Sequence, residues 1–121
     1  MSNRVKVGII GSQFISAIHA ESLDRCQSAE MIAVASPTPG NAEKFAKTHR
    51  IPKHFTDYRE LLSVPEIDMV VIGIPNDLHC EVVVAAAEAG KHIVIEKPFC
   101  LNMAEADKMI AAAAKANVKL M

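Results

Sequence analysis

Short β-branched runs alternate with helical stretches along the chain, and this alternation constrains the fold more than any other feature. The runs are Val5–Ile10, Met31–Ala35, Lys53–Phe55, Met69–Ile72 and His92–Ile95, with Val118–Met121 as the start of another. They lack polar alternation, so both faces of the sheet should be buried. Strand–helix alternation at this spacing implies right-handed crossovers. We therefore expect an α/β fold in three layers, a doubly wound parallel sheet between helices.

Five stretches between the strands have helical character. The expected helices cover Phe14–Cys26, Asn41–Thr48, Asp57–Leu62, Asp77–Ala89 and Asn102–Lys115. Thr56 and Asn76 are expected to cap the third and fourth helices, and Gly90 is a suitable residue to follow the fourth. Asn102 and Glu105 have the spacing of a capping box, which predicts the start of the fifth helix.

Length and charge set bounds on the organisation and the partners of the protein. A chain of 121 residues fits one domain, so residues 1–121 are expected to form it. The formal net charge is −1 and no cluster of one sign stands out, which gives no support for binding nucleic acid or a membrane surface. The N-terminus leads straight into a strand pattern and does not resemble a signal peptide.

The cysteines and histidines favour neither a disulfide framework nor a metal site. Cys26, Cys80 and Cys100 are odd in number and have no paired spacing. We interpret them as free thiols in a reducing cytoplasm. The histidines are scattered along the sequence, so no metal site is expected.

The segment Val5–Ser16 reads as a strand, a tight turn and the start of a helix. Such a turn aims the free N–H groups and the dipole of the helix at a phosphate. The full dinucleotide fingerprint has three glycines, of which only Gly11 is present, with Gln13 and Ser16 at the other two places. Gln13 would either push the loop outward or use its amide as a hydrogen-bond donor. On its own this motif is weak.

The end of the second strand bears on the choice between NAD and NADP. An acidic residue that binds the ribose of NAD usually lies about 20 positions beyond the loop. Here that position is Ser36, with Thr38 close behind. Two hydroxyls and no carboxylate favour NADP slightly, although no arginine is adjacent. An ordinary Ser-Pro-Thr-Pro-Gly turn explains the same residues without any ligand.

The second half of the chain carries a more specific set of residues. Pro75-Asn76 is followed by His79, then by Gly90-Lys91-His92 and by Glu96-Lys97-Pro98 at the end of the fifth strand. Together with the first loop, this ordered set resembles the N-terminal domain of the glucose–fructose oxidoreductase/inositol dehydrogenase (Gfo/Idh/MocA) family. The resemblance covers essentially the whole chain.

The resemblance implies a Rossmann domain of an NAD(P)-dependent oxidoreductase that acts on sugars, cyclitols or related alcohols. It implies that Lys97 is the catalytic residue, which lies beside the nicotinamide and forms a hydrogen bond with the reacting substrate oxygen, and that Glu96 helps to place it. The residues it implies for cofactor contact are Gly11, Ser12, Gln13, Phe14, Ile15, Ser36, Thr38, Pro75, Asn76, His79, Glu96 and Lys97. A cis bond before Pro98 would aim the lysine.

The same resemblance predicts that the substrate domain is absent and that the chain is truncated before it. The isolated chain is then expected to bind NAD or NADP without turnover, and its exposed apolar surface to favour a homo-oligomer. One alternative is a non-enzymatic sensor or interaction module of the same fold that has lost the dinucleotide. Another is a different doubly wound protein. A receiver domain would need clustered aspartates at strand ends, and a methyltransferase would have a more glycine-rich loop and an acid in place of Ser36.

Overall fold

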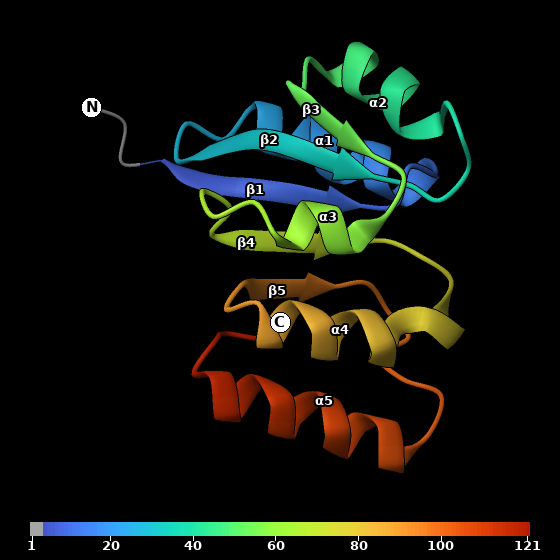
Figure 1. Cartoon of the computed structure of the whole chain (residues 1–121), viewed down its shortest axis with the longest axis vertical. Helices are drawn as coiled ribbons and strands as arrows, with labels where there is room; N and C mark the ends of the chain where they lie inside the picture. The colour runs from blue at the N-terminus through green and yellow to red at the C-terminus, as the bar shows by residue number, and fades with distance from the viewer. Residues whose placement is uncertain (1–3) are drawn as a thin grey trace.

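A computed structural model describes residues 4–121, which form a five-stranded sheet with strand order β3-β2-β1-β4-β5. All of its strand pairs are parallel. The strands are β1 (Val5–Ile10), β2 (Ala29–Ala35), β3 (Lys53–Phe55), β4 (Met69–Ile72) and β5 (His92–Ile95). Figure 1 shows this sheet with its helices, and the chain reverses direction of winding between β1 and β4. The predicted doubly wound parallel sheet is confirmed.

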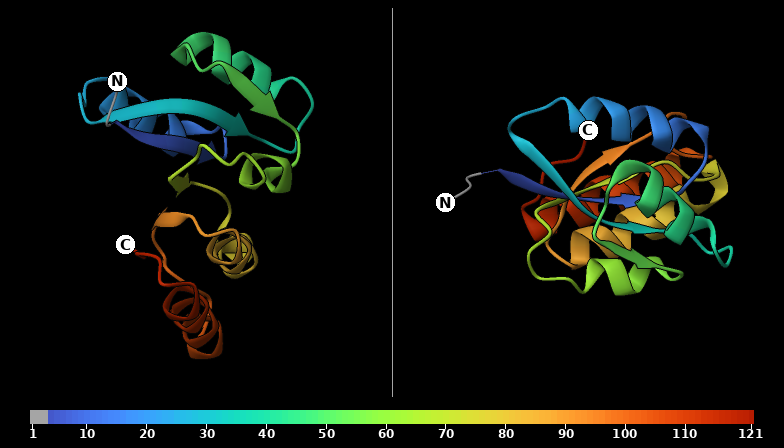
Figure 2. Two further views of the ribbon diagram at one scale, coloured as in Figure 1. Left: turned by 60° about the vertical axis from the view of Figure 1, so that its left-hand side comes forward. Right: turned by 90° about the horizontal axis from the view of Figure 1, so that it is seen from above.

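Helices cover both faces of the sheet (Figure 2). They are α1 (Phe14–Asp24), α2 (Asn41–His49), α3 (Tyr58–Leu62), α4 (His79–Glu88) and α5 (Met103–Ala116). Ile9 of β1 packs in one buried cluster with α1 and α2, whereas its neighbour Ile10 belongs to a second cluster with α3, α4 and α5. Successive strand residues point to opposite faces, so these two clusters are the two sides of one sheet. The continuous β-branched strands are buried on both sides because each side carries helices.

The ends of the helices differ in places from those expected. The side chain of Asp57 caps α3 by accepting a hydrogen bond from the backbone N–H of Arg59, so Thr56 is not the cap. Residues Asn76–Leu78 form a single 3₁₀ turn, η1, and α4 begins only at His79 without a side-chain cap. The side chain of Asn102 does cap α5, accepting from the N–H of Glu105.

The last residues continue the sheet beyond β5. The backbone N–H of Ile93 donates to Lys119 O at 2.8 Å, and the N–H of Ile95 donates to Met121 O at 2.8 Å. Leu120 makes a parallel bridge with Ile93. The expected strand start at the end of the chain is therefore paired beside β5.

Lys91 supports the sheet at the edge opposite to the carboxyl ends of the strands. Its side chain is buried, and Nζ donates hydrogen bonds to Val64 O at 2.8 Å and Ile67 O at 2.9 Å. These carbonyls belong to the loop between α3 and β4. Burial lowers the pKa of the Lys91 ammonium group, although Asp68 and Glu66 partly oppose the shift. None of the helices within residues 4–121 is both long and apolar enough to cross a bilayer.

Candidate functional site

A cleft of about 640 Å³ opens where β1, β2 and β4 end. The carboxyl edge of a parallel sheet, at the point where the winding reverses, is where α/β proteins bind ligands. Six of the residues that the sequence singled out line this cleft: Gly11, Ser12, Gln13, Ser36, Thr38 and Pro75. The structure therefore brings the first loop, the end of β2 and the start of the loop after β4 to one place.

Gly11 makes the turn that leads from β1 to α1. Its φ is +112°, a conformation that side chains rarely adopt, and a Cβ here would overlap Gly73 O. The N–H of Gly11 donates to Ala35 O at 2.8 Å, which ties the turn to the end of β2. The single glycine retained from the fingerprint is thus the one that the backbone requires.

The N-terminus of α1 is open toward the cleft. Gln13 precedes the helix with φ −92° and ψ −167°, which any residue adopts, and makes no side-chain cap. The first turn of α1 carries no acidic residue. Uncapped N–H groups at a helix N-terminus fit an anion such as a pyrophosphate. The side chain of Gln13 is exposed and is part of the lining of the cleft.

Ser16 occupies the position of the third fingerprint glycine and is fully buried. Its Oγ lies 3.5 Å from Gly73 O. A Cβ on Gly73 would lie 2.8 Å from that Oγ, so the missing side chain at residue 73 makes room for the one at residue 16. Because Gly73 has no side chain, α1 packs closely against the end of β4 even though residue 16 is serine and not glycine.

Ser36 is buried at the end of β2, and its Oγ lies 2.8 Å from Ser12 Oγ. The contact joins two of the three loops that form the cleft. Thr38 is exposed at the rim. Neither position offers a carboxylate to the cleft.

Helices α3 and α4 form a wall of the cleft that the sequence did not predict. The hydroxyl of Tyr58 donates to Glu81 Oε2 at 2.8 Å. Arg59 lies 3.6 Å from both Asp57 and Glu81, and its guanidinium stands 4.7 Å from the centre of the Tyr58 ring. Burial, and then the bond to Glu81, raise the pKa of Tyr58. The sequence offered no sign of this wall because Tyr58 and Glu81 meet only through the packing of α3 on α4.

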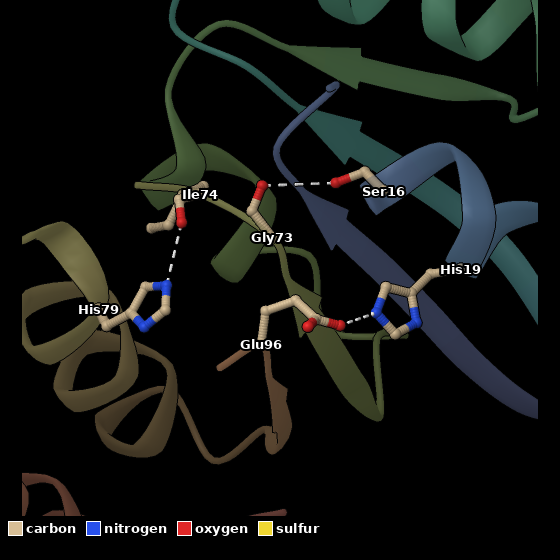
Figure 3. Close-up of polar contacts among 6 residues, drawn as sticks. All are labelled: Ser16, His19, Gly73, Ile74, His79 and Glu96. Carbon is tan, nitrogen blue, oxygen red and sulfur yellow. Dashed lines mark hydrogen bonds and ion pairs between the residues drawn. The ribbon is translucent and has the colours of Figure 1, made fainter. Parts of the chain in front are cut away.

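The Glu96-Lys97-Pro98 segment follows β5 and lies outside the lining of this cleft. The Lys97–Pro98 peptide bond is cis, as expected. The Lys97 side chain is exposed, and within residues 4–121 its ammonium group forms no hydrogen bond or ion pair. Glu96 lies 2.7 Å from His19 of α1, which the sequence did not single out (Figure 3).

The other sequence-predicted residues lie beside the cleft and do not line it. Phe14 is exposed at the start of α1, Ile15 is half-buried beside Gly73, and Asn76 is exposed in η1. His79 is buried: its ring nitrogens lie 2.9 Å from Pro98 O and 3.0 Å from Ile74 O, and Figure 3 shows the contact with Ile74. It therefore lies beneath two loops and not on their outer surface. No group of three metal-ligating side chains is found among residues 4–121.

Comparison with known proteins agrees with a Rossmann-like parallel sheet. Residues 5–121 match the oxidoreductase family with the NAD-binding Rossmann fold, Gfo/Idh/MocA. The chain belongs to this family. It is 34% identical over 116 residues to a myo-inositol 2-dehydrogenase of Thermotoga maritima, a match that covers 96% of this chain and 35% of that protein.

Solved structures similar to this chain include complexes with nicotinamide cofactors. Scyllo-inositol dehydrogenase from Lactobacillus casei, with NAD(H) and scyllo-inositol, is 28% identical with a TM-score of 0.90, covering 98% of this chain and 35% of that one. Biliverdin reductase from Synechocystis sp. PCC 6803, with biliverdin and NADP⁺, is 31% identical with a TM-score of 0.89, covering 96% and 36%. The chain thus spans about a third of the length of these relatives, the part that forms the NAD-binding domain.

Proposed function

We propose that this chain binds a nicotinamide dinucleotide across the carboxyl edge of its sheet. The open N-terminus of α1 behind Gly11 is the observation that carries the proposal, because it combines free N–H groups with a helix dipole. The adenosine half would lie in the cleft near Ser36. The nicotinamide half would extend toward Lys97. Ser12, Gln13, Phe14 and Ile15 would surround the pyrophosphate.

The choice between NAD and NADP rests on the end of β2. No carboxylate stands at Ser36 or Thr38 to repel a 2′-phosphate, so we favour NADP slightly. The Ser36 hydroxyl already contacts Ser12, which leaves Thr38 as the freer donor. Relatives with NAD(H) and with NADP⁺ are both known.

Lys97 would supply the chemistry in a protein that also carries a substrate domain. Removing hydride from an alcohol carbon needs a group that accepts the proton of the hydroxyl and stabilises the developing alkoxide. A free ammonium at the end of β5 suits the second task, and a neutral amine would suit the first. The substrate class we propose is a sugar, cyclitol or related alcohol. The three free cysteines suit a reducing compartment, and we place the protein in the cytoplasm.

Titration of the purified chain with NADH and NADPH, followed by nicotinamide fluorescence or by calorimetry, tests the proposal. Saturable binding of either dinucleotide, without turnover of inositol or sugars, is expected. Absence of binding at millimolar concentrations would count against it. Gln13→Gly then separates the causes, since recovered binding would mean that Gln13 obstructs the pyrophosphate.

A second candidate is a sensor or interaction module of the same fold that has lost the dinucleotide. The observation that favours it is Gln13, whose Cβ stands where the fingerprint has none. A Gln13→Gly variant that stayed without binding would favour this module.

A further inference from the structure

Lys97 is flanked in the sequence by two residues that are held from opposite faces of the sheet. Glu96 is held by His19 of α1, and Pro98 is held by His79 of α4. Helices α1 and α4 belong to the two separate hydrophobic clusters on either side of the strands. The turn that presents the free lysine is therefore attached on both sides, and Figure 3 shows the contact between His19 and Glu96 on the α1 side.

The contact on the α1 side involves a carboxylate. His19 Nε2 lies 2.7 Å from Glu96 Oε2, and the two side chains are 27% and 24% exposed. A pair this short and this sheltered from water has a better-defined geometry than a fully exposed pair. The backbone N–H of Glu96 also donates to Ile72 O at 3.1 Å. Backbone and side chain of Glu96 are thus fixed by different elements, β4 and α1.

The contact on the α4 side joins two loops. The imidazole of His79 is 1% exposed, with Nδ1 2.9 Å from Pro98 O and Nε2 3.0 Å from Ile74 O. Both partners are carbonyl oxygens, which accept a hydrogen bond from a ring nitrogen that carries a hydrogen. Ile74 precedes Pro75 in the loop that lines the cleft. His79 therefore links the cleft to the turn that carries Lys97.

We propose that His19 and His79 are positioning residues that hold Lys97 against the nicotinamide half of the dinucleotide. This inference rests on the proposed function. Neither histidine is expected to touch the dinucleotide. His19 acts through Glu96, and His79 acts through the carbonyl of Pro98. Loosening either contact should weaken binding of the nicotinamide half and leave the adenosine half unaffected.

NADH and ADP-ribose serve as the two probes, since ADP-ribose lacks the nicotinamide. The intact chain and each variant are titrated with both probes. The quantity compared is the ratio of the affinity for NADH to the affinity for ADP-ribose. His19→Ala should lower the ratio by roughly tenfold to a hundredfold, as for one charge-assisted hydrogen bond. His19→Gln retains an N–H near the Nε2 position and should restore most of it. His54→Ala, at an exposed position of β3, should leave the ratio unchanged.

His79 has its own matched pair of variants. The amide nitrogen of Asn reaches the place of Nδ1, and that of Gln reaches the place of Nε2. His79→Asn keeps the donor to Pro98 and should preserve the ratio, whereas His79→Gln keeps only the donor to Ile74 and should lower it. If the role of His79 were purely structural, each variant would lower both affinities equally. The smaller Asn side chain would then lower them more than Gln does. Thermal melting verifies that each variant is folded. If the His79 variants unfold, the His19 variants are used for the test, because His19 is partly exposed.

The outcomes separate the two proposals. Binding of both probes by the intact chain, with ratios that fall in His19→Ala and His79→Gln only, supports the positioning role. Binding of both probes with ratios unchanged in every variant overturns the positioning role and leaves the dinucleotide site in place. Failure of the intact chain to bind either probe overturns both.

Discussion

Gly11 lies so close to Gly73 that a side chain on Gly11 would displace the loop that carries Gly73. A Cβ on Gly11 would overlap Gly73 O, and a Cβ on Gly73 would lie 2.8 Å from Ser16 Oγ and 2.9 Å from Ile15 Cγ2. The N–H of Gly73 also donates to Ile10 O at 2.9 Å. The ends of β1 and β4, where the sheet changes its direction of winding, are thereby kept in contact beneath the cleft.

Gly11→Ala should destabilise the fold strongly. The substitution combines a left-handed φ of +112° with overlap of backbone atoms. We expect a loss of at least ~3 kcal/mol in the free energy of unfolding, measured with urea. Gly40→Ala is the matched control, because its φ is +87° but nothing lies within 4 Å of the added Cβ. That control should lose only about 1–2 kcal/mol, the cost of the conformation alone. Equal losses would contradict the role of the Gly73 contact.

Gln13→Glu should change stability and binding in opposite directions. The exposed side chain precedes the first turn of α1, which carries no acidic residue. A negative charge there interacts favourably with the helix dipole, so the free energy of unfolding should rise by about 0.3–1 kcal/mol. The same charge would repel a pyrophosphate, so affinity for NADH should fall by about tenfold or more. Gln13→Ala removes the amide without adding charge and is the control. If Gln13→Glu binds NADH with the same affinity as the native chain, the pyrophosphate does not bind next to residue 13.

Lys91 should stabilise the fold more as the pH rises. Burial lowers its pKa in the folded chain below that of the unfolded chain, so the unfolded chain binds the proton more tightly. Between the lowered pKa and about 10.4, stability therefore increases with pH through this group. The neutral amine still has hydrogens for Val64 O and Ile67 O.

The measurement is urea unfolding of the native chain and of Lys91→Met from pH 7 to 10. The variant leaves two carbonyls without their partner and should lose about 2 kcal/mol at pH 7. The difference between the two proteins should widen toward pH 10. A difference that narrows with rising pH would contradict the assignment. Taking the difference cancels the other groups that titrate in this range, including Tyr58 and Cys80.

Tyr58 should ionise above its ordinary range. It is the only tyrosine, and the chain has no tryptophan, so absorbance near 295 nm follows this hydroxyl alone. Burial and the hydrogen bond to Glu81 both raise its pKa, burial more strongly. The midpoint should therefore lie above 10 in the native chain. Glu81→Gln should lower the midpoint without returning it fully to 10, because burial remains. An unchanged midpoint would mean that the contact between α3 and α4 does not persist in solution.

Local patterns were sufficient for most of the secondary structure. Val5–Ile10, Met69–Ile72 and His92–Ile95 are strands with the expected bounds, since their continuous β-branched side chains favour extended backbone wherever both faces are covered. Gly90 ends α4 with φ +78°, and Asn102 caps α5, as short-range chemistry indicated. The first residues of α3 and α4 were not found, because several nearby polar residues can cap a helix and the packing of the helix selects among them.

The sequence by itself determined the doubly wound sheet, the tight turn at Gly11 and the lysine that follows β5. These features follow from neighbours in the chain or from an ordered motif. Only the tertiary structure decided the wall of Tyr58 and Glu81, the exchange of space between Ser16 and Gly73, and the attachment of Glu96 to His19. The last two residues are 77 positions apart. Such contacts depend on how helices settle on the sheet, and side-chain packing over long sequence separations leaves no periodic trace in the chain.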